Sequence, residues 1–256
     1  MADDTAVAPT DTRGVTRAWT TLDAVDTPDG RLALRRRGDD DFLITLAGRV
    51  LMNSRTSRSE AALGELAAQA SQAAGSSAAG SSEAGSSAEG SSEAPRILIG
   101  GLGMGCTLRA ALDALPAQAE VVVSELNQVV VRWCDGALAP LTAHASGDAR
   151  VCIEIGDVVD RIDAAARRRG EFHAIALDLY EGPHAGRGAE RDPLFGRAAL
   201  DTTRRALRAG GTFAVWTEHR DAGFERRLRA AGFGFEVRRP GRGGLRHAVY
   251  LARPVA

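Results

Sequence analysis

Four glycines follow one apolar run of the sequence and stand where a strand would give way to a helix. Gly100, Gly101, Gly103 and Gly105 come between "RILI" and the helix-like run "CTLRAALDALP". Glycines at such a junction let the backbone turn tightly and let a ligand approach the main chain, and the following helix offers free N–H groups. In dinucleotide enzymes such N–H groups hold a pyrophosphate. The loop therefore favours a nucleotide site, and the alternative is a tight turn without a ligand.

Two acidic residues end the next two apolar runs. Glu125 closes "EVVVSE", about 20 residues after the loop, where a carboxylate can accept both hydroxyls of a ribose. The alternative is an exposed acid at a strand end. Asp157 closes "ARVCIEIGD", where proteins that bind S-adenosyl nucleosides place an acid on the adenine amino group. Its alternative is a helix N-cap, because Asp caps helices well and "VVDRI" follows; both roles can coexist.

The fourth apolar run ends in "ALDLYEGP", which brings together Asp178, Tyr180 and Glu181. Two acids beside an aromatic ring suit a cationic or amine substrate: the acids attract the cation and the ring can pack on it. A carboxylate can also take the proton that an amine loses as it becomes a nucleophile, and Asp178 is the candidate base. The alternative is loop acids that cap helices, since clustered acids mark sites only statistically.

These residues need a scaffold that brings the ends of several strands to one edge. The strand-like runs are "RILIGG", "EVVVSELN", "ARVCIEIGD", "FHAIALDLYEGP" and "TFAVWTE", separated by helix-like runs. Alternation of this kind predicts a parallel sheet covered on both faces. The final segment, "GFEVRRPGRGGLRHAVYLARP", predicts a hairpin with Gly243 and Gly244 at its turn. The layout is that of an α/β class I methyltransferase-type Rossmann fold with a C-terminal antiparallel hairpin, whose ligands lie at the carboxyl ends of the strands.

Two further expectations about this scaffold concern the glycine pair at 210–211 and Trp216. We expect a helix over 192–211, closed by Gly210 and Gly211. We expect Trp216, at the end of the fifth strand, in the core.

Composition divides the chain into four segments. We expect residues 1–30 to form a loose start that gains structure near 17–22, and residues 31–70 a small antiparallel β-unit with a helix over 57–70. Residues 71–95 are expected to form a disordered linker built from "GSSAA"-type repeats, and residues 96–256 the S-adenosyl-nucleoside-binding Rossmann domain. Gly and Ser at this density cannot build a core, because no buried side chain offsets the entropy of ordering them.

The totals narrow the classes of partner. A formal net charge of −1 over 256 residues gives no global field that would favour nucleic acid. Cys106, Cys134 and Cys152 are odd in number and far apart, which argues against disulfides and zinc and indicates a reducing, cytoplasmic compartment. The histidines show no ligand spacing, so no metal is expected. No run approaches the roughly 18 apolar residues that span a bilayer, and we expect no membrane partner.

At this point the chain resembles the spermidine synthase family of aminopropyltransferases. "GGLGMGCTLR" is similar to the family's Gly-Gly-Gly-Asp-Gly-Gly segment, "DLYEGP" to its Asp-x-x-Asp-Pro, and "SEAALGE" to its Asp-Glu-x-x-Tyr-His-Glu, with Glu60 and Glu65 matching. The resemblance implies Asp178 as proton acceptor, and Glu60 and Glu181 on the acceptor amine. It also implies transfer of an aminopropyl group from decarboxylated S-adenosylmethionine to a small-molecule amine in polyamine biosynthesis, and a homodimer.

The sequence departs from this family where the substrate would lie. Gly103 or Met104 stands in place of the loop Asp that holds the donor's amine, and Leu63 and Gly64 replace the Tyr-His pair that lines the amine pocket. Loss of the loop acid favours a second hypothesis, a methyltransferase that uses intact S-adenosylmethionine. A third hypothesis is a non-catalytic, nucleoside-binding relative.

Overall fold

The computed structural model describes residues 17–79, 93–180, 182–184, 186, 188–240 and 247–255. The chain divides into two compact units, Met1–Thr56 and Ser57–Ala256. Among the described residues, no helix is both long enough and apolar enough to cross a membrane.

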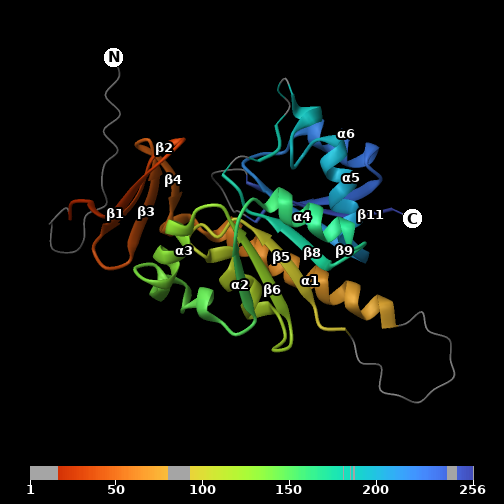
Figure 1. The fold of residues 1–256 in the computed structure, drawn as a ribbon, viewed down its shortest axis with the longest axis horizontal. Helices are drawn as coiled ribbons and strands as arrows, with labels where there is room; N and C mark the ends of the chain where they lie inside the picture. Colours follow the sequence, from red (N-terminus) through yellow and green to blue (C-terminus); the bar gives the residue numbers. More distant parts are fainter. Residues whose placement is uncertain are drawn as a thin grey trace. The chain divides into compact units, whose positions relative to one another are not determined.

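The first unit is a four-stranded antiparallel sheet in the order β1-β2-β3-β4 (Figure 1). Its core is formed by alternate side chains such as Leu32, Leu34 and Ile44, all buried, as the period-two pattern of half-buried strands requires. The expected antiparallel unit is confirmed, and it begins earlier than expected, because β1 lies within the segment 1–30. The elements are β1 (Thr20–Thr27), β2 (Gly30–Arg37), β3 (Asp41–Leu46), β4 (Arg49–Asn53) and the 3-10 helix η1 (Ser54–Thr56).

The second unit is built on a seven-stranded sheet in the order β10-β11-β9-β8-β5-β6-β7. Strands β5 to β9 run parallel, and β11 pairs antiparallel with both β9 and β10. This is the expected parallel sheet with a C-terminal antiparallel hairpin. The strands are β5 (Arg96–Gly100), β6 (Glu120–Glu125), β7 (Val151–Ile155), β8 (Phe172–Leu177), β9 (Leu207–Thr217), β10 (Phe233–Arg238) and β11 (Ala248–Pro254). The hairpin turn expected at 243–244 lies outside the described residues.

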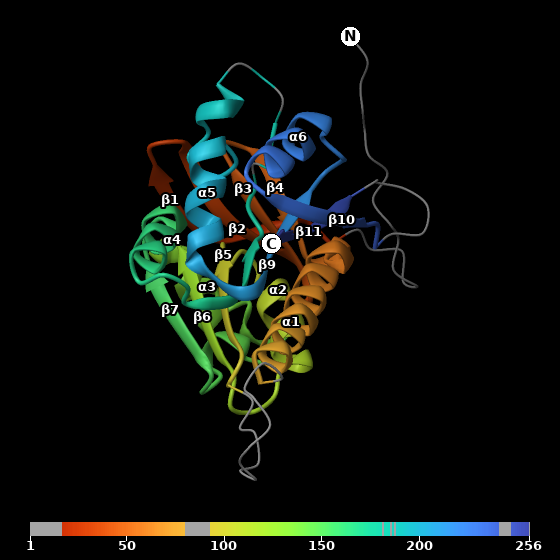
Figure 2. The ribbon, with the colours of Figure 1, turned by 90° about the vertical axis from the view of Figure 1, so that its right-hand side faces the viewer.

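Helices cover both faces of this sheet (Figures 1 and 2). Helix α1 packs on α2 and across β8 and β9, whereas α4 packs on α5 and α5 on α6. Phe172, Ile175 and Phe213 are buried where the strands meet these helices. The helices are α1 (Arg58–Ala79), α2 (Cys106–Ala114), α3 (Gln128–Asp135), α4 (Val158–Arg167), α5 (Arg197–Ala206) and α6 (Ala222–Ala230), and the 3-10 turns are η2 (Ala139–Thr142), η3 (Ala145–Gly147) and η4 (Ala189–Arg191).

Helix α1 extends to Ala79 and so includes residues 71–79 of the segment assigned to a linker. Ser71 and Ala74 are buried, and the Gln72 side-chain amide donates to the Ala114 carbonyl at the end of α2 (3.0 Å). Packing against the sheet and α2 therefore outweighs the weak helix propensity of Gly and Ser. Helix α1 also belongs to the second unit rather than to the β-unit before it. Residues 80–92 lie outside the described part of the chain.

The helix expected over 192–211 is shorter, and the two glycines that were to close it lie inside β9. Helix α5 ends at Ala206, and β9 begins at Leu207. Gly210 has a φ of 73°, and a β-carbon on Gly211 would lie 2.9 Å from the Arg208 carbonyl oxygen. The register between β8 and β9 shifts at this level. The glycines therefore serve a bulge in a strand, a conformation that the sequence does not distinguish from a helix end.

Candidate functional site

The glycine loop between β5 and α2 is packed tightly against the strand beside it. A β-carbon on Gly100 would lie 2.7 Å from Leu177 Cδ2, and one on Gly101, whose φ is 87°, would lie 2.5 Å from the Asp178 carbonyl oxygen. Gly103 and Gly105 also have positive φ, 53° and 81°. Backbone conformation and close packing thus account for these glycines before any ligand is considered. The same packing brings the loop into contact with the backbone of Asp178.

Glu125 is buried and joins this loop to the turn after β6. Its Oε2 accepts a hydrogen bond from the Leu102 N–H (2.9 Å), and its Oε1 accepts one from the Asn127 N–H (2.8 Å). Its side chain is only 6% exposed, so the alternative of an exposed acid at a strand end is wrong. Each oxygen keeps one further lone pair. Glu125 therefore fixes the loop, and its binding to a ribose remains a prediction.

Asp157 caps helix α4, which is the alternative role that the sequence indicated for it. Its Oδ1 accepts a hydrogen bond from the Val159 N–H at 2.9 Å, which satisfies one of the free donors at the helix start. The side chain is exposed. A cap that faces solvent is compatible with the predicted contact to a nucleobase.

Large apolar side chains are exposed where β6, β7 and β8 end. Leu126 follows β6 and is 66% exposed, Ile155 ends β7 and is 51% exposed, and Tyr180 follows β8 and is 49% exposed. All three lie at or just beyond the carboxyl ends of parallel strands, the side of the sheet where ligands bind in open α/β folds. Sequence analysis singled out Tyr180 but missed Leu126, which follows Glu125, and Ile155, which lies two residues before Asp157. Glu181 lies outside the described residues.

Asp178 follows β8 and lies within hydrogen-bonding distance of a hydroxyl on α2. Its Oδ2 is 2.6 Å from Thr107 Oγ1, and the same Oγ1 is 3.0 Å from the Glu60 carbonyl oxygen on α1. Burial raises the pKa of Asp178 to about 7; the Thr107 hydrogen bond lowers it, and the nearby Glu60 charge raises it further. Asp178 is thus an acid that changes protonation state near neutral pH.

The Thr107 hydroxyl has one proton and two acceptors in reach. When Asp178 is ionised, Thr107 can donate to its carboxylate; when Asp178 is protonated, it can donate to Thr107, which then donates to the Glu60 carbonyl. The protonation state of Asp178 is therefore linked to a hydrogen bond between α1 and α2. Sequence analysis missed Thr107, because a Thr in the first turn of a helix carries no signal of its own.

Glu60 takes part in a second chain of polar contacts that reaches the start of β11. Ser59 Oγ donates to Glu60 Oε2 (2.9 Å) and lies 2.9 Å from His247 Nδ1. The His247 ring packs edge-on against Trp216, with centroids 4.9 Å apart. Trp216 is only partly buried, so it lines this cluster rather than the interior of the core. His247 was missed, since nothing in the sequence places residue 247 beside residue 59.

Gly64 lies where α1 and α2 meet backbone to backbone. A β-carbon on Gly64 would lie 2.2 Å from the Thr107 carbonyl oxygen and 2.9 Å from the Ala111 nitrogen. Leu63 is fully buried. Leu63 and Gly64 stand in place of the Tyr-His pair of the family that the sequence resembles. They pack the two helices together and therefore cannot line an amine pocket.

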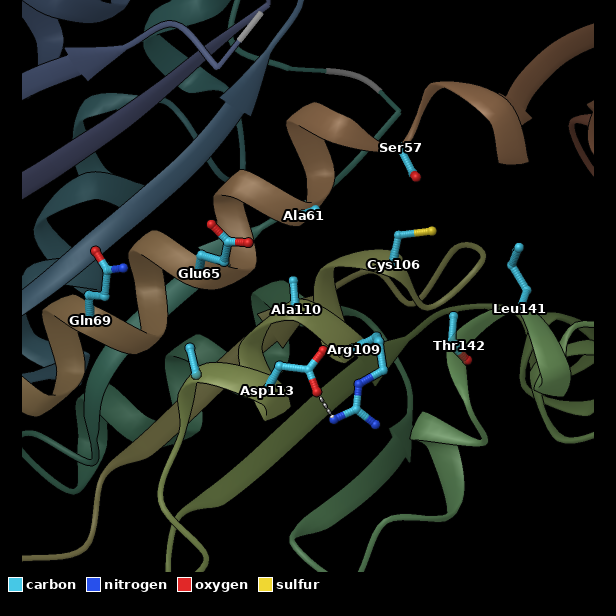
Figure 3. A pocket seen from close by; sticks show the side chains of 11 residues that line it. Ser57, Ala61, Glu65, Gln69, Cys106, Arg109, Ala110, Asp113, Leu141 and Thr142 are labelled. Atoms are coloured by element: carbon cyan, nitrogen blue, oxygen red, sulfur yellow. Dashed lines mark hydrogen bonds and ion pairs between the residues drawn. The ribbon is translucent and has the colours of Figure 1, made fainter.

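A groove of about 480 Å³ runs between α1 and α2 (Figure 3). Glu65 lines it from α1, and Cys106 and the ion-paired Arg109 and Asp113 (2.5 Å) line it from α2. Cys106 lies near the charges of Glu60 and Asp178. Burial raises the pKa of its thiol to about 11; a hydrogen bond with Ser57 lowers it, and the Glu60 and Asp178 charges raise it slightly. The thiol therefore stays protonated at neutral pH.

Within the described ranges, no three or more His, Cys, Asp or Glu side chains gather as a metal site would require. The structure brings Glu60 and Asp178 together through Thr107, and it ties Glu125 to the glycine loop. Asp157 and Tyr180 lie exposed beyond the carboxyl ends of β7 and β8.

Comparisons with known proteins bear on the fold. No protein-family model matches the sequence, and no curated protein matches it. Spermidine synthase from Thermotoga maritima is 16% identical, with 91% of this chain and 72% of that chain covered and a TM-score of 0.63. A probable spermidine synthase from Corynebacterium glutamicum is 16% identical, with 92% and 79% covered and a TM-score of 0.55.

A human methyltransferase-like protein 13 in complex with SAH is also similar, at 17% identity, 79% and 82% coverage and a TM-score of 0.50. At such identities the likeness concerns the fold. Most of the chain, including the N-terminal sheet and the seven-stranded sheet, therefore has the fold of solved spermidine synthases, a fold related to that of methyltransferases.

Proposed function

We propose that the chain is a transferase that takes an S-adenosyl-type donor and moves an aminopropyl group from decarboxylated S-adenosylmethionine to a small amine. The observation that carries the proposal is Asp178, whose pKa is raised to about 7 chiefly by burial and which lies against the glycine loop. A general base works best when its pKa lies near the operating pH. Few other carboxylates in a protein meet that condition, because their ordinary pKa lies near 4.

In this proposal the acceptor nitrogen attacks the carbon bonded to the donor's sulfonium. The N–C bond forms as the C–S bond breaks, and its electron pair stays on sulfur, which leaves methylthioadenosine. Asp178 takes the proton that the amine loses, while Thr107 donates to the carboxylate before that transfer and accepts from it afterwards. Glu60, 2.9 Å from Ser59, attracts the cationic acceptor. Holding the reactants in line would supply much of the rate.

The donor's nucleoside would lie at the carboxyl ends of β5, β6 and β7. There Glu125 would accept from the ribose through its remaining lone pairs and Asp157 from the adenine amino group. The exposed side chains of Leu126 and Ile155 would cover the faces of the base, which removes apolar surface from water.

A second candidate is methyl transfer from intact S-adenosylmethionine, and one observation favours it. Gly103 and Met104 stand where the resembling family has the acid that holds the donor's amine, and Met104 is buried. The loop therefore offers no carboxylate for the amine of a decarboxylated donor. A third candidate, a non-catalytic nucleoside binder, predicts binding without turnover.

Calorimetric titration with S-adenosylmethionine, its decarboxylated form and methylthioadenosine separates these candidates. Tighter binding of the decarboxylated donor than of the intact one, with formation of an aminopropylated amine, is expected. Tighter binding of intact S-adenosylmethionine would favour methyl transfer. Binding of methylthioadenosine without turnover of either donor would favour the non-catalytic candidate, and no binding of any of the three compounds would contradict every S-adenosyl proposal.

A further inference from the structure

A pocket rich in arginine lies at the edge of the sheet away from Asp178. It has a volume of about 510 Å³, and we call it the basic pocket; its lining residues are Ala166, Arg167, Arg169, Arg204, Arg205 and Leu207. Leu207 is the first residue of β9, whereas Asp178 follows the last residue of the parallel strand β8. A strand of six residues is roughly 20 Å long. The basic pocket is therefore separate from the proposed transferase site.

The arginines reach the basic pocket from the ends of two helices. Arg167 is the last residue of α4, and Arg204 and Arg205 lie in the last turn of α5. A helix C-terminus carries a partial negative charge of about half an elementary charge, so one cation at each end would suffice to balance it. Four arginines leave an excess of positive charge in this pocket.

Acidic side chains do not remove that excess. Arg204 approaches Asp201 at 3.6 Å, and Arg205 donates to the Thr202 hydroxyl (3.0 Å). In the part of the chain that the structure describes, Arg167 and Arg169 form no ion pair. At least two guanidinium groups are thus available to an anion.

The acid closest in sequence is already used by other cations. Glu171 is buried and pairs with Arg96 (3.0 Å), Arg161 and Arg168 (3.4 Å). Although burial alone would raise the pKa of Glu171, these guanidinium groups hold it below its usual value. Its carboxylate is therefore occupied and cannot neutralise the basic pocket.

The backbone of Arg169 supplies an independent observation. Its φ is 56°, in the left-handed region where Gly or Asn normally ends a helix. The next residue, Gly170, passes so close to β9 that a β-carbon on it would lie 3.1 Å from the Leu207 carbonyl oxygen. The loop thus holds an arginine, rather than a glycine, in an unfavourable conformation beside the pocket. Strained residues of this kind cluster at ligand sites.

We propose that the basic pocket binds a small anion that carries several phosphate-type charges, such as a diphosphate group. The planar fork of Arg matches phosphate oxygens two at a time. The volume of about 510 Å³ lies within the range of small-molecule sites. A net charge of −1 for the whole chain does not supply the extended positive field that a long nucleic acid requires, which favours a small ligand.

Calorimetric titration of the full chain with pyrophosphate at about 0.1 M salt tests this proposal. We expect saturable binding that the variant Arg169→Ala/Arg205→Ala weakens about tenfold or more, because each removed guanidinium takes charge-assisted hydrogen bonds with it. The matched control is Arg49→Ala/Arg226→Ala, which removes the same charge from exposed positions elsewhere and should bind as the unmodified chain does.

Three results would overturn the proposal. One is no binding of pyrophosphate to the unmodified chain, and another is equal weakening in both double variants, which would indicate general electrostatics. The third is binding of single-stranded RNA with no binding of pyrophosphate, which would assign the pocket to nucleic acid. Circular dichroism of each variant establishes that it is folded. Because the titration involves no S-adenosyl donor, its outcome is independent of the transferase proposal.

Discussion

Gly64 on α1 and Thr107 on α2 are in contact through their main chains, and a β-carbon on Gly64 would lie only 2.2 Å from the Thr107 carbonyl oxygen. The same Thr107 holds Asp178 through its hydroxyl. Close packing of two helices therefore sets the position of a side chain next to the candidate base.

Gly64→Ala is expected to lower the free energy of unfolding by about 1–3 kcal/mol, because the new methyl group has no space and the helices must separate. Denaturation by urea measures the change. Gly147→Ala is the matched control, since a β-carbon there meets nothing within 4 Å; its stability should change little. Equal stability of both variants would contradict the close contact.

Asp178→Asn is expected to reduce turnover with the accepted donor by roughly 10²–10⁴-fold, the usual contribution of a general base. Nucleoside affinity, measured by calorimetry, should barely change, since the amide keeps the shape of the side chain. Asp113→Asn, which alters an exposed acid on α2, should keep both properties. Unchanged turnover in Asp178→Asn would remove this residue from the mechanism.

The raised pKa of Asp178 predicts a pH dependence of folding. The carboxyl pKa is about 7 in the folded chain against an ordinary 3.8, so between these values the folded state holds a proton that the unfolded state has released. Its contribution to stability is complete below pH 3.8 and is lost as the pH rises through about 7. Urea denaturation at several pH values should show this fall in the unmodified chain, by at most about 4 kcal/mol. Asp178→Asn should lack this component of the fall, whereas a parallel decline in both proteins would contradict the assignment.

Thr107→Val is expected to move the pH–rate profile to higher pH. The Thr107 hydrogen bond lowers the pKa of Asp178, so its removal leaves burial and the Glu60 charge unopposed and the carboxylate harder to form. The variant should lose most activity at pH 7 and recover part of it at higher pH. Thr107→Ser, which restores the hydroxyl, should restore the original profile. A profile of unchanged midpoint in Thr107→Val would rule out control of Asp178 through this hydroxyl.

The sequence predicted the sheet well, for a physical reason. Strands buried on both faces must be nearly continuous apolar runs, and β5, β6 and β8 have that pattern. Strand β5 leads into the glycine loop, β6 ends at Glu125, and Asp178 follows β8. The predictions failed where tertiary packing overrides local preference. Residues 71–79 continue α1 despite their Gly and Ser content, and Gly210 lies in a bulged strand.

The candidate site was predictable only in its acids. Asp178 and Glu60 were found from their place in sequence patterns, but their connection through Thr107 depends on how closely α1 approaches α2. His247 joins Ser59 across 188 positions of the chain, a distance that no local pattern encodes. Likewise Glu125 was expected at a strand end, but its bonds to the backbone of the loop emerge only from the folded geometry.

The contact between Gly101 and the Asp178 carbonyl has a consequence for how such a protein can diversify. Because a β-carbon at Gly101 would come within 2.5 Å of that oxygen, this half of the loop is locked to the strand that carries the acid. Position 104 lies beyond this contact, whereas position 103 is restricted by its positive φ of 53°. In the proposed reaction, substitution at position 104 would therefore change the choice of donor while Asp178, the proposed proton acceptor, keeps its place, so that the two properties could evolve separately.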